Sequence, residues 1–394
     1  STAPAIAGSG VATITRQPCD ARAPAAVAAV IPPSSSMRSA VPGPGGGSLI
    51  VGGKGGFGAA LTYSSISNDV LASIRSAEVS NLASTNVRAY TAAQIGAGGA
   101  MVGLTNADAA LTLGGAFVIS RISNETVAEI EGATLTNPGD TVVLARDVQR
   151  GSEPVAAFDN VLDQGACTED CDELAHQQLY DFGGGEARRW EELEDADDGG
   201  DIRPRQTQAG SSIIAVAGVV QGSLKGSNVG LSVTFSDIAN DIRARLVDSS
   251  VDGAGAVRVQ AETHATIMSY SVGIGIGDRF SGGGSLTHNM IRNETAAEVD
   301  LGRNQLADGL ALEAGSLTVT AADRSEILGV AGMVSASLNN SAAGFSLTGG
   351  LTLNETRALL RGHDMAVGGR VAVQADNEAR IMALGVTGGV SRES

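Results

Sequence analysis

The stretch "NETVAEI", residues 124–130, decides the fold because the chain contains it five times in varied form. Each copy has an asparagine first, an acidic residue second, an alanine fifth and an aliphatic residue seventh. The other copies are "NDVLASI" at 68–74, "NDIRARL" at 240–246, "NETAAEV" at 293–299 and "NETRALL" at 354–360. Recurring self-similarity is typical of repeat proteins, whose units pack on their neighbours. We therefore predict structural roles for two recurring residues, at Asn68, Asn124, Asn240, Asn293 and Asn354, and at Ala72, Ala128, Ala244, Ala297 and Ala358.

Two further features follow each asparagine and set the length of the repeat. A Val-x-Ala step follows, and in four copies its alanine lies 21 residues after the asparagine. In the copy that begins at Asn293, the same alanine lies seven residues later than this spacing. An isoleucine six residues after that alanine opens a strand of small residues, as Ile267 does after Ala261. Together these spacings give a unit of about 54 residues. The exception is the step from Ala145 to Ile213, which are 68 residues apart, so about 62 residues are inserted there.

The apolar pattern within a unit predicts strands. Val257, Val259 and Ala261 alternate with polar residues, and this period of two indicates a half-buried strand. The segment "SSIIAVAGVVQGSL", residues 211–224, lacks clean alternation and charge, so we expect it to be covered on both faces. About three strands per unit, each near 18 residues with its turn, predict an all-β chain folded as a parallel β-solenoid. The alternative fold is two stacked antiparallel sheets, but the tight hairpin turns that it needs are few.

Composition divides the chain into four parts. Residues 1–47 are rich in Pro, Gly, Ala and Ser and read as a linker or flexible extension. Solenoid repeats are expected over 48–148 and again over 210–394, with the last repeat incomplete. Between them, the acidic insert 149–209 contains two segments, 168–182 and 185–196, that are rich in helix-favouring residues. The prediction is therefore one partly helical insert that projects from the solenoid.

The insert holds the candidate covalent and metal sites. Cys167 and Cys171, in "CTEDC", are close enough for a local disulfide in an oxidising compartment, although two free thiols are an equal alternative. Asp195, Asp197 and Asp201 begin a pattern that Ca²⁺ could use. The carboxylate expected at the twelfth loop position is absent, so a solvated acidic loop is the favoured interpretation. The four histidines are scattered and lack zinc spacing, and no cofactor other than this calcium candidate is expected.

Charge and hydropathy exclude several partners. The formal net charge is −17 without a long basic run, so nucleic acid is not an expected partner. No apolar run of about 18 or more residues exists, so the chain is not expected to span a membrane as a helix. The first residues, "STAPAIAGSG", lack both an initiating Met and a signal-peptide core. We expect a processed product or an excised piece of a longer chain.

The recurring block resembles a known family. An "IxALGVAGxVSxS" strand, then "NxTxA", then "GGxVxVxA", is similar to the repeats of large bacterial exoproteins of the filamentous haemagglutinin and leukotoxin-adhesin type. The resemblance covers about residues 48–150 and 210–394. It implies a right-handed β-helix, secretion across an outer membrane, an extracellular or cell-surface location, and an adhesive or stalk-like role. The acidic insert departs from the family pattern, and so does the missing amino-terminal secretion domain.

Three functions follow, and we place a non-enzymatic stalk or adhesin fibre first, with the insert making specific contacts to a surface receptor or glycan. A self-assembling extracellular filament that stacks on itself is the second hypothesis. A polysaccharide-active β-helix enzyme is the third, because Glu125, Glu294 and Glu355 could act as paired carboxylates. Asp69 and Asp241 take the same place in other copies, which favours a structural role at each copy. The asparagine itself is predicted to lie at a corner where a strand starts.

Overall fold

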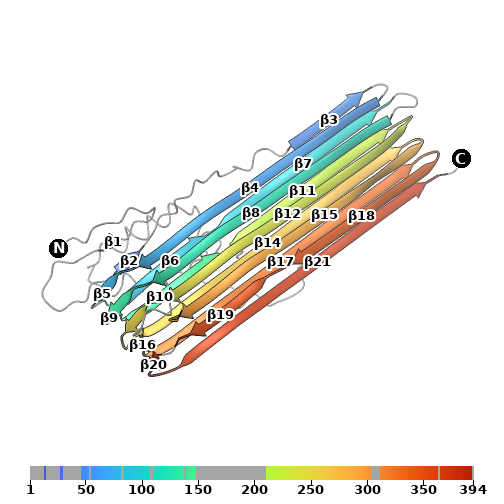
Figure 1. The fold of residues 1–394 in the computed structure, drawn as a ribbon. Coiled ribbons are helices and arrows are strands. Elements are labelled where there is room, and N and C mark those ends of the chain that lie inside the picture. Colours follow the sequence, from blue (N-terminus) through green and yellow to red (C-terminus); the bar gives the residue numbers. More distant parts are fainter. Residues whose placement is uncertain are drawn as a thin grey trace, which may run out of the picture.

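The computed structural model describes most of the repeat region (Figure 1). The described residues are 13–14, 27–29, 46–52, 55–80, 84–106, 111–136, 139–147, 210–302, 311–362 and 364–392. All of their regular structure is β-strand, arranged in three sheets. The prediction of an all-β chain is confirmed.

Each repeat forms one wide coil with three sides. A coil runs along a long strand of sheet B, then a short strand of sheet C, and returns along sheet A. Sheet B contains β4 (Gly55–Arg75), β8 (Leu111–Glu131), β12 (Ser227–Val247), β15 (Phe280–Asp300), β18 (Ser341–Thr352) and β19 (Glu355–Arg361). Sheet C contains β5 (Glu78–Ser80), β9 (Thr134–Thr136), β13 (Ser250–Asp252), β16 (Ala311–Ala314) and β20 (Asp364–Val367). Five such coils stack in the part of the chain that the structure describes.

Sheet A completes the coils. Its strands are β3 (Gly46–Gly52), β6 (Ser84–Thr91), β7 (Ala93–Thr105), β10 (Asp140–Asp147), β11 (Ser211–Ser223), β14 (Ala256–Gly277), β17 (Ser316–Ser337) and β21 (Val371–Ser391). Two short strands, β1 (Thr13–Ile14) and β2 (Val27–Ala29), pair antiparallel, and β2 also pairs with β6. All other strand pairs between the described residues are parallel, which confirms the parallel β-solenoid over the antiparallel alternative.

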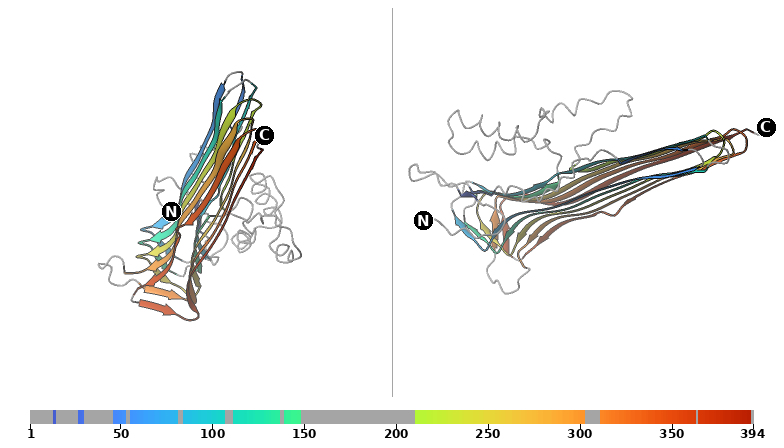
Figure 2. Two further views of the ribbon diagram at one scale, coloured as in Figure 1. Left: turned by 90° about the vertical axis from the view of Figure 1, so that its right-hand side faces the viewer. Right: turned by 90° about the horizontal axis from the view of Figure 1, so that it is seen from above.

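The strand lengths differ from the expected three equal sides. A complete coil has long strands of 21 and 22 residues and a short one of three or four, as in β12, β14 and β13. Figure 2 shows the consequence: sheet C separates the long sheets at one end, and they lie close together at the other. We call the part without sheet C the distal half, which in the third coil comprises residues 227–239 of β12 and 265–277 of β14.

Side-chain size explains why the distal half is thin. Many of its inward positions carry Gly, Ser, Ala and Thr, with a few larger residues such as Ile238 and Ile267, and one inward column on sheet B is glycine in every coil. An added Cβ at Gly283 would lie 2.4 Å from the backbone oxygen of Gly230, and one at Gly230 would lie 2.8 Å from Cγ1 of Val219. The end next to sheet C instead buries larger aliphatic side chains, such as Leu246 and Leu312. The glycine column consists of Gly58, Gly114, Gly230, Gly283 and Gly344.

The expectation that 211–224 is covered on both faces was wrong. In β11, inward residues such as Ile213 and Ala215 are buried, whereas Ile214 and Val216 are 47% and 45% exposed. The strand lacks visible alternation in its sequence because apolar residues occupy both its faces. Its outer face is therefore apolar and open.

The predicted insertion takes the place of a single residue in a strand of sheet A. Ala145 pairs with Ala261 and Ile213 pairs with Ile267, as the repeat spacing requires. Residues 148–210 thus replace one outward residue, which is His264 in the next coil. The helical segments predicted for 149–209, and nearly all of 1–47, lie outside the described residues. The part of the chain that the structure describes has no helix with the length and apolar character needed to cross a bilayer.

Candidate functional site

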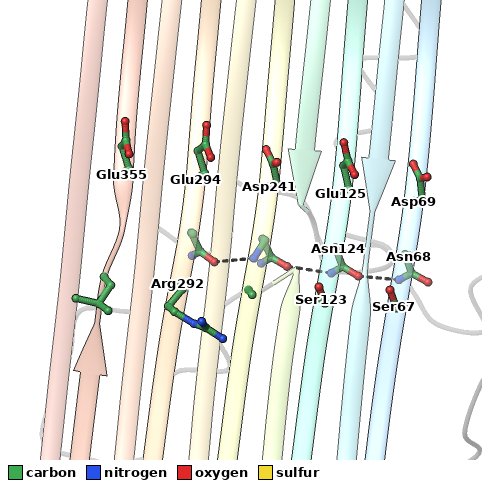
Figure 3. Close-up of a pocket in the computed structure, with 14 residues that line it drawn as sticks. Ser67, Asn68, Asp69, Ser123, Asn124, Glu125, Asp241, Arg292, Glu294 and Glu355 are labelled. Atoms are coloured by element: carbon green, nitrogen blue, oxygen red, sulfur yellow. Dashed lines mark hydrogen bonds between the residues drawn. The ribbon is translucent and has the colours of Figure 1, made fainter.

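A row of carboxylates crosses the outer face of sheet B. The alternation of the strands turns the residue after each recurring asparagine outward, and parallel pairing in register stacks these residues at the strand spacing of about 4.8 Å. Figure 3 shows the five side chains in line. An open hollow of about 660 Å³ follows the row. This acidic row consists of Asp69, Glu125, Asp241, Glu294 and Glu355.

Behind the acidic row, the asparagines form a ladder inside the solenoid. Nδ2 of Asn68 donates to Oδ1 of Asn124 at 3.0 Å, and Nδ2 of Asn124 donates to Oδ1 of Asn240 at 3.1 Å. The backbone N–H of Asn240 donates to Oδ1 of Asn293, and that of Asn293 to Oδ1 of Asn354. The ladder satisfies buried amides that would otherwise be costly. The repeated asparagine thus has a structural role, as predicted: it forms hydrogen bonds between successive coils.

The predicted position of the asparagine at a corner was wrong. Asn124 and Asn240 lie inside the long strands β8 and β12, and their side chains are 3% and 2% exposed. A side-chain ladder between identical residues, rather than a turn, explains the repetition. The recurring alanine packs inward beside it: Ala128 and Ala244 are fully buried in the core next to sheet C.

Two buried aspartates of sheet A meet the ladder across the interior. Asn240 donates to Oδ2 of Asp147 at 2.9 Å, and Asn293 donates to Oδ2 of Asp323 at 2.9 Å. Burial raises the pKa of Asp147 to about 8, although hydrogen bonding to Ser211 opposes the shift. Burial also raises the pKa of Asp323. Both carboxyls therefore resist ionisation inside the solenoid.

The aspartates were missed because no motif in the sequence marks them. They occupy one inward column of sheet A, in which other coils have Thr91, Thr263 and Asn377. A polar residue at this place in every unit, two residues after the alanine of the Val-x-Ala step, is the signal that could have found the column.

Charge compensation distinguishes the middle of the acidic row from its ends. Arg243 contacts Asp241 at 2.7 Å and Glu294 at 3.3 Å. Partial burial raises the pKa of Asp241; Arg243 opposes this rise, and the neighbouring Glu294 and Glu125 add to it. The row is thus a set of crowded carboxylates, of which Asp241 and Glu294 share the cation Arg243.

This arrangement gives the outer face of sheet B a negatively charged strip, which attracts cationic groups. An enzyme acting on glycans needs two carboxylates in different surroundings, one held protonated and one ionised. The acidic row instead repeats one outward position at each coil. Among the described residues, no cluster of His, Cys, Asp or Glu has the arrangement needed to hold a metal ion. The candidate calcium residues Asp195, Asp197 and Asp201, and the cysteines Cys167 and Cys171, lie outside the described residues.

Two of the three "NET" asparagines, Asn124 and Asn293, are also poorly placed for glycosylation. Asn124 and Asn293 are each 3% exposed, and Thr126 and Thr295 are fully buried.

No protein-family model, no curated protein and no solved structure matches this chain.

Proposed function

We propose that this chain is a non-enzymatic structural segment of a secreted or cell-surface bacterial protein, and that it acts as a stalk or adhesin fibre. The observation that carries the proposal is the repetition of each side-chain column through five coils, including the acidic row and the ladder behind it. Repetition of this kind produces a long rigid surface, whereas catalysis needs one site with unique surroundings.

The position of the insertion supports separate roles for the solenoid, as a support, and for the insert, as the binding part. Asp147 and Ser211 both hydrogen-bond to Asn240 in the interior, at places separated by one residue in other coils. The solenoid is therefore continuous across the junction. Insertions in repeat proteins map to one face, which is often the binding face. We assign the specific contacts, with a surface receptor or glycan, to residues 149–209.

The experiment is a deletion that leaves the strand intact. Residues 148–210 are replaced by one histidine, which joins Asp147 to Ser211 as His264 joins its neighbours in the third coil. Binding of the full and shortened chains is measured on cultured mammalian cells and on a panel of acidic and neutral glycans. We expect the shortened chain to lose roughly tenfold or more in affinity, which corresponds to about 1.4 kcal/mol.

A circular dichroism spectrum and an unfolding midpoint like those of the full chain would show that the deletion leaves the solenoid folded. Equal binding by both chains would contradict the assignment to the insert. A full chain that binds none of these surfaces would contradict the adhesive role.

A further inference from the structure

The distal half of the solenoid has apolar side chains on its outer faces as well as in its interior. Its interior mixes buried aliphatic residues, such as Ile238, with buried hydroxyl and amide residues, such as Ser232 and Asn289. Its outer faces carry large apolar side chains. On sheet B, Phe57 is 79% exposed, Leu61 68% and Leu347 59%. In a soluble protein, contiguous apolar surface of this kind marks a contact surface.

The apolar face of sheet B is large enough for a stable interface. It spans five outward columns, which in the third coil run from Ser227 to Phe235, and none contains Asp, Glu, Lys or Arg in any coil. With a rise of about 3.3 Å per residue and a strand spacing of about 4.8 Å, the face measures roughly 26 by 24 Å. Two such faces would together bury on the order of 1,200 Å², within the range of specific interfaces.

The face also has projecting rings and a shallow depression, into which side chains of another apolar surface can pack. Three aromatic rings, those of Phe117, Phe280 and Phe345, lie over glycines, and a Cβ at Gly115 would approach the ring of Phe117 to 2.7 Å. Between Phe280 and Phe345, a shallow apolar depression of about 540 Å³ is floored by the backbone of 282–284.

Sheet A has an apolar outer face too, but the chain leaves and re-enters through it. Residues 148–210 begin after Asp147 and end before Ser211, at an outward position bordering the apolar part of sheet A. The strands of sheet B run through the distal half without a comparable insertion. Sheet B is therefore the face from which no long segment departs.

We propose that two copies of this chain pair through the apolar faces of sheet B, with their strands running in opposite directions. Charge selects this orientation. If the strands of the two copies ran in the same direction, the acidic row of one copy would face that of the other, and facing like charges cost several kcal/mol. With opposed strands, the apolar columns cover one another and the acidic rows lie at opposite ends of the pair.

The opposed arrangement brings apolar columns of the two copies into contact. The two-fold axis passes through the middle column of the face, so each Leu231 contacts the Leu231 of the other copy. Columns on either side exchange places, which sets Phe57 against Leu61, and Gly282 against Leu286. This is a self-complementary contact of the kind that two-fold dimers use.

The first test is the mass of the full chain in solution by sedimentation equilibrium. The wild-type chain is expected to be a dimer. Leu231→Asp places two carboxylates at the two-fold axis and is expected to give a monomer. Val216→Asp makes the same change at an exposed position on sheet A, so it is expected to remain a dimer. Circular dichroism of both variants checks that they fold.

A monomeric wild-type chain at tens of micromolar, or a dimeric Leu231→Asp variant, would overturn the proposal. Dissociation by Val216→Asp alone would place the contact on sheet A and would overturn it as well. Flotation of wild-type monomers with vesicles of phosphatidylcholine and phosphatidylglycerol would identify lipid as the occupant of the face instead.

The second test measures the orientation. A nitroxide is attached at Glu125→Cys in a chain whose natural cysteines are replaced by serine. The labels lie ten residues from the axis, so opposed strands place them roughly 65 Å apart at about 3.3 Å per residue. Strands in the same direction would place them within about 20 Å. The short distance would overturn the opposed arrangement.

Discussion

The amide of Asn240 donates a hydrogen bond to Oδ2 of Asp147 at 2.9 Å, which joins sheet B to sheet A inside the solenoid. Oδ1 of the same Asn240 accepts from Asn124 and from Ser211. One side chain therefore links successive coils and opposite sheets. This connection ties the recurring asparagine to the stability of the whole stack.

Asn240→Ala should lower the free energy of unfolding by about 2–4 kcal/mol, because it leaves several buried polar groups without a partner. Asn68→Ala is the matched control at the end of the ladder, where one amide bond to Asn124 is lost, and its cost should be about 1 kcal/mol. Urea unfolding followed by circular dichroism measures both changes. Equal effects at the two positions would contradict the ladder as a cooperative element.

Asp147 should make the solenoid less stable as pH rises. Burial raises its pKa to about 8 in the folded state, so between pH 5 and 8 the folded protein keeps a proton that the unfolded chain has lost. The contribution of this group is complete below pH 4 and is lost as pH rises toward 8, on the order of 1 kcal/mol per pH unit.

Asp147→Asn should flatten this decline, and the unfolding midpoint at several pH values between 5 and 8 measures it. Part of the slope should remain, because burial also raises the pKa of Asp323. An unchanged slope in Asp147→Asn would contradict a protonated carboxyl in the interior.

Glu129 should contribute more to stability than an exposed ion pair. Its side chain is 3% exposed and lies between Arg75 of the first coil and Arg245 of the third, with Nη2 of Arg245 at 2.7 Å from Oε2. Glu129→Gln leaves two guanidinium groups near a neutral amide, and we expect a loss of about 1–3 kcal/mol.

The matched control is Glu298→Gln, which breaks the pair with the half-exposed Arg357. We expect less than about 1 kcal/mol there. Thermal unfolding at low and high salt compares the two variants. A larger loss at Glu298 than at Glu129 would contradict the difference in burial.

The inward glycine column should not tolerate a methyl group. Gly283→Ala would bring Cβ to 2.4 Å from the backbone oxygen of Gly230, and a backbone atom in a paired strand has little freedom to move. We expect a loss of about 1–3 kcal/mol. The control Gly218→Ala points outward with nothing within 4 Å, and its effect should stay within about 0.5 kcal/mol. Denaturant midpoints of the two variants make the comparison.

The repeat spacing was sufficient to predict the register of the coils. It aligned Ala145 with Ala261 and Ile213 with Ile267 across the insertion, and the strand pairs confirm both alignments. Spacing depends only on the number of residues per coil, which parallel stacking preserves. The lengths of the three sides were not predictable, because they depend on how closely the sheets approach at inward positions such as Gly230.

The polar contacts of the interior and the apolar character of the outer faces could also not be predicted from the sequence. Asn240 and Asp147 belong to different sheets and meet only when the coil closes, so no local pattern links them. In β11, Ile213 points inward and Ile214 points outward, yet the two are the same residue type. Hydrophobic patterning cannot separate a strand buried on both faces from one whose exposed face is apolar.

We infer that this solenoid acts by contact and not by turnover. One assay tests it directly: the full chain is mixed with the glycan panel, and retained glycan and released reducing ends are measured in the same sample. We predict saturable retention without release, unchanged in a Glu125→Gln and Glu294→Gln double variant. Release of reducing ends by the full chain that disappears in the double variant would contradict the account.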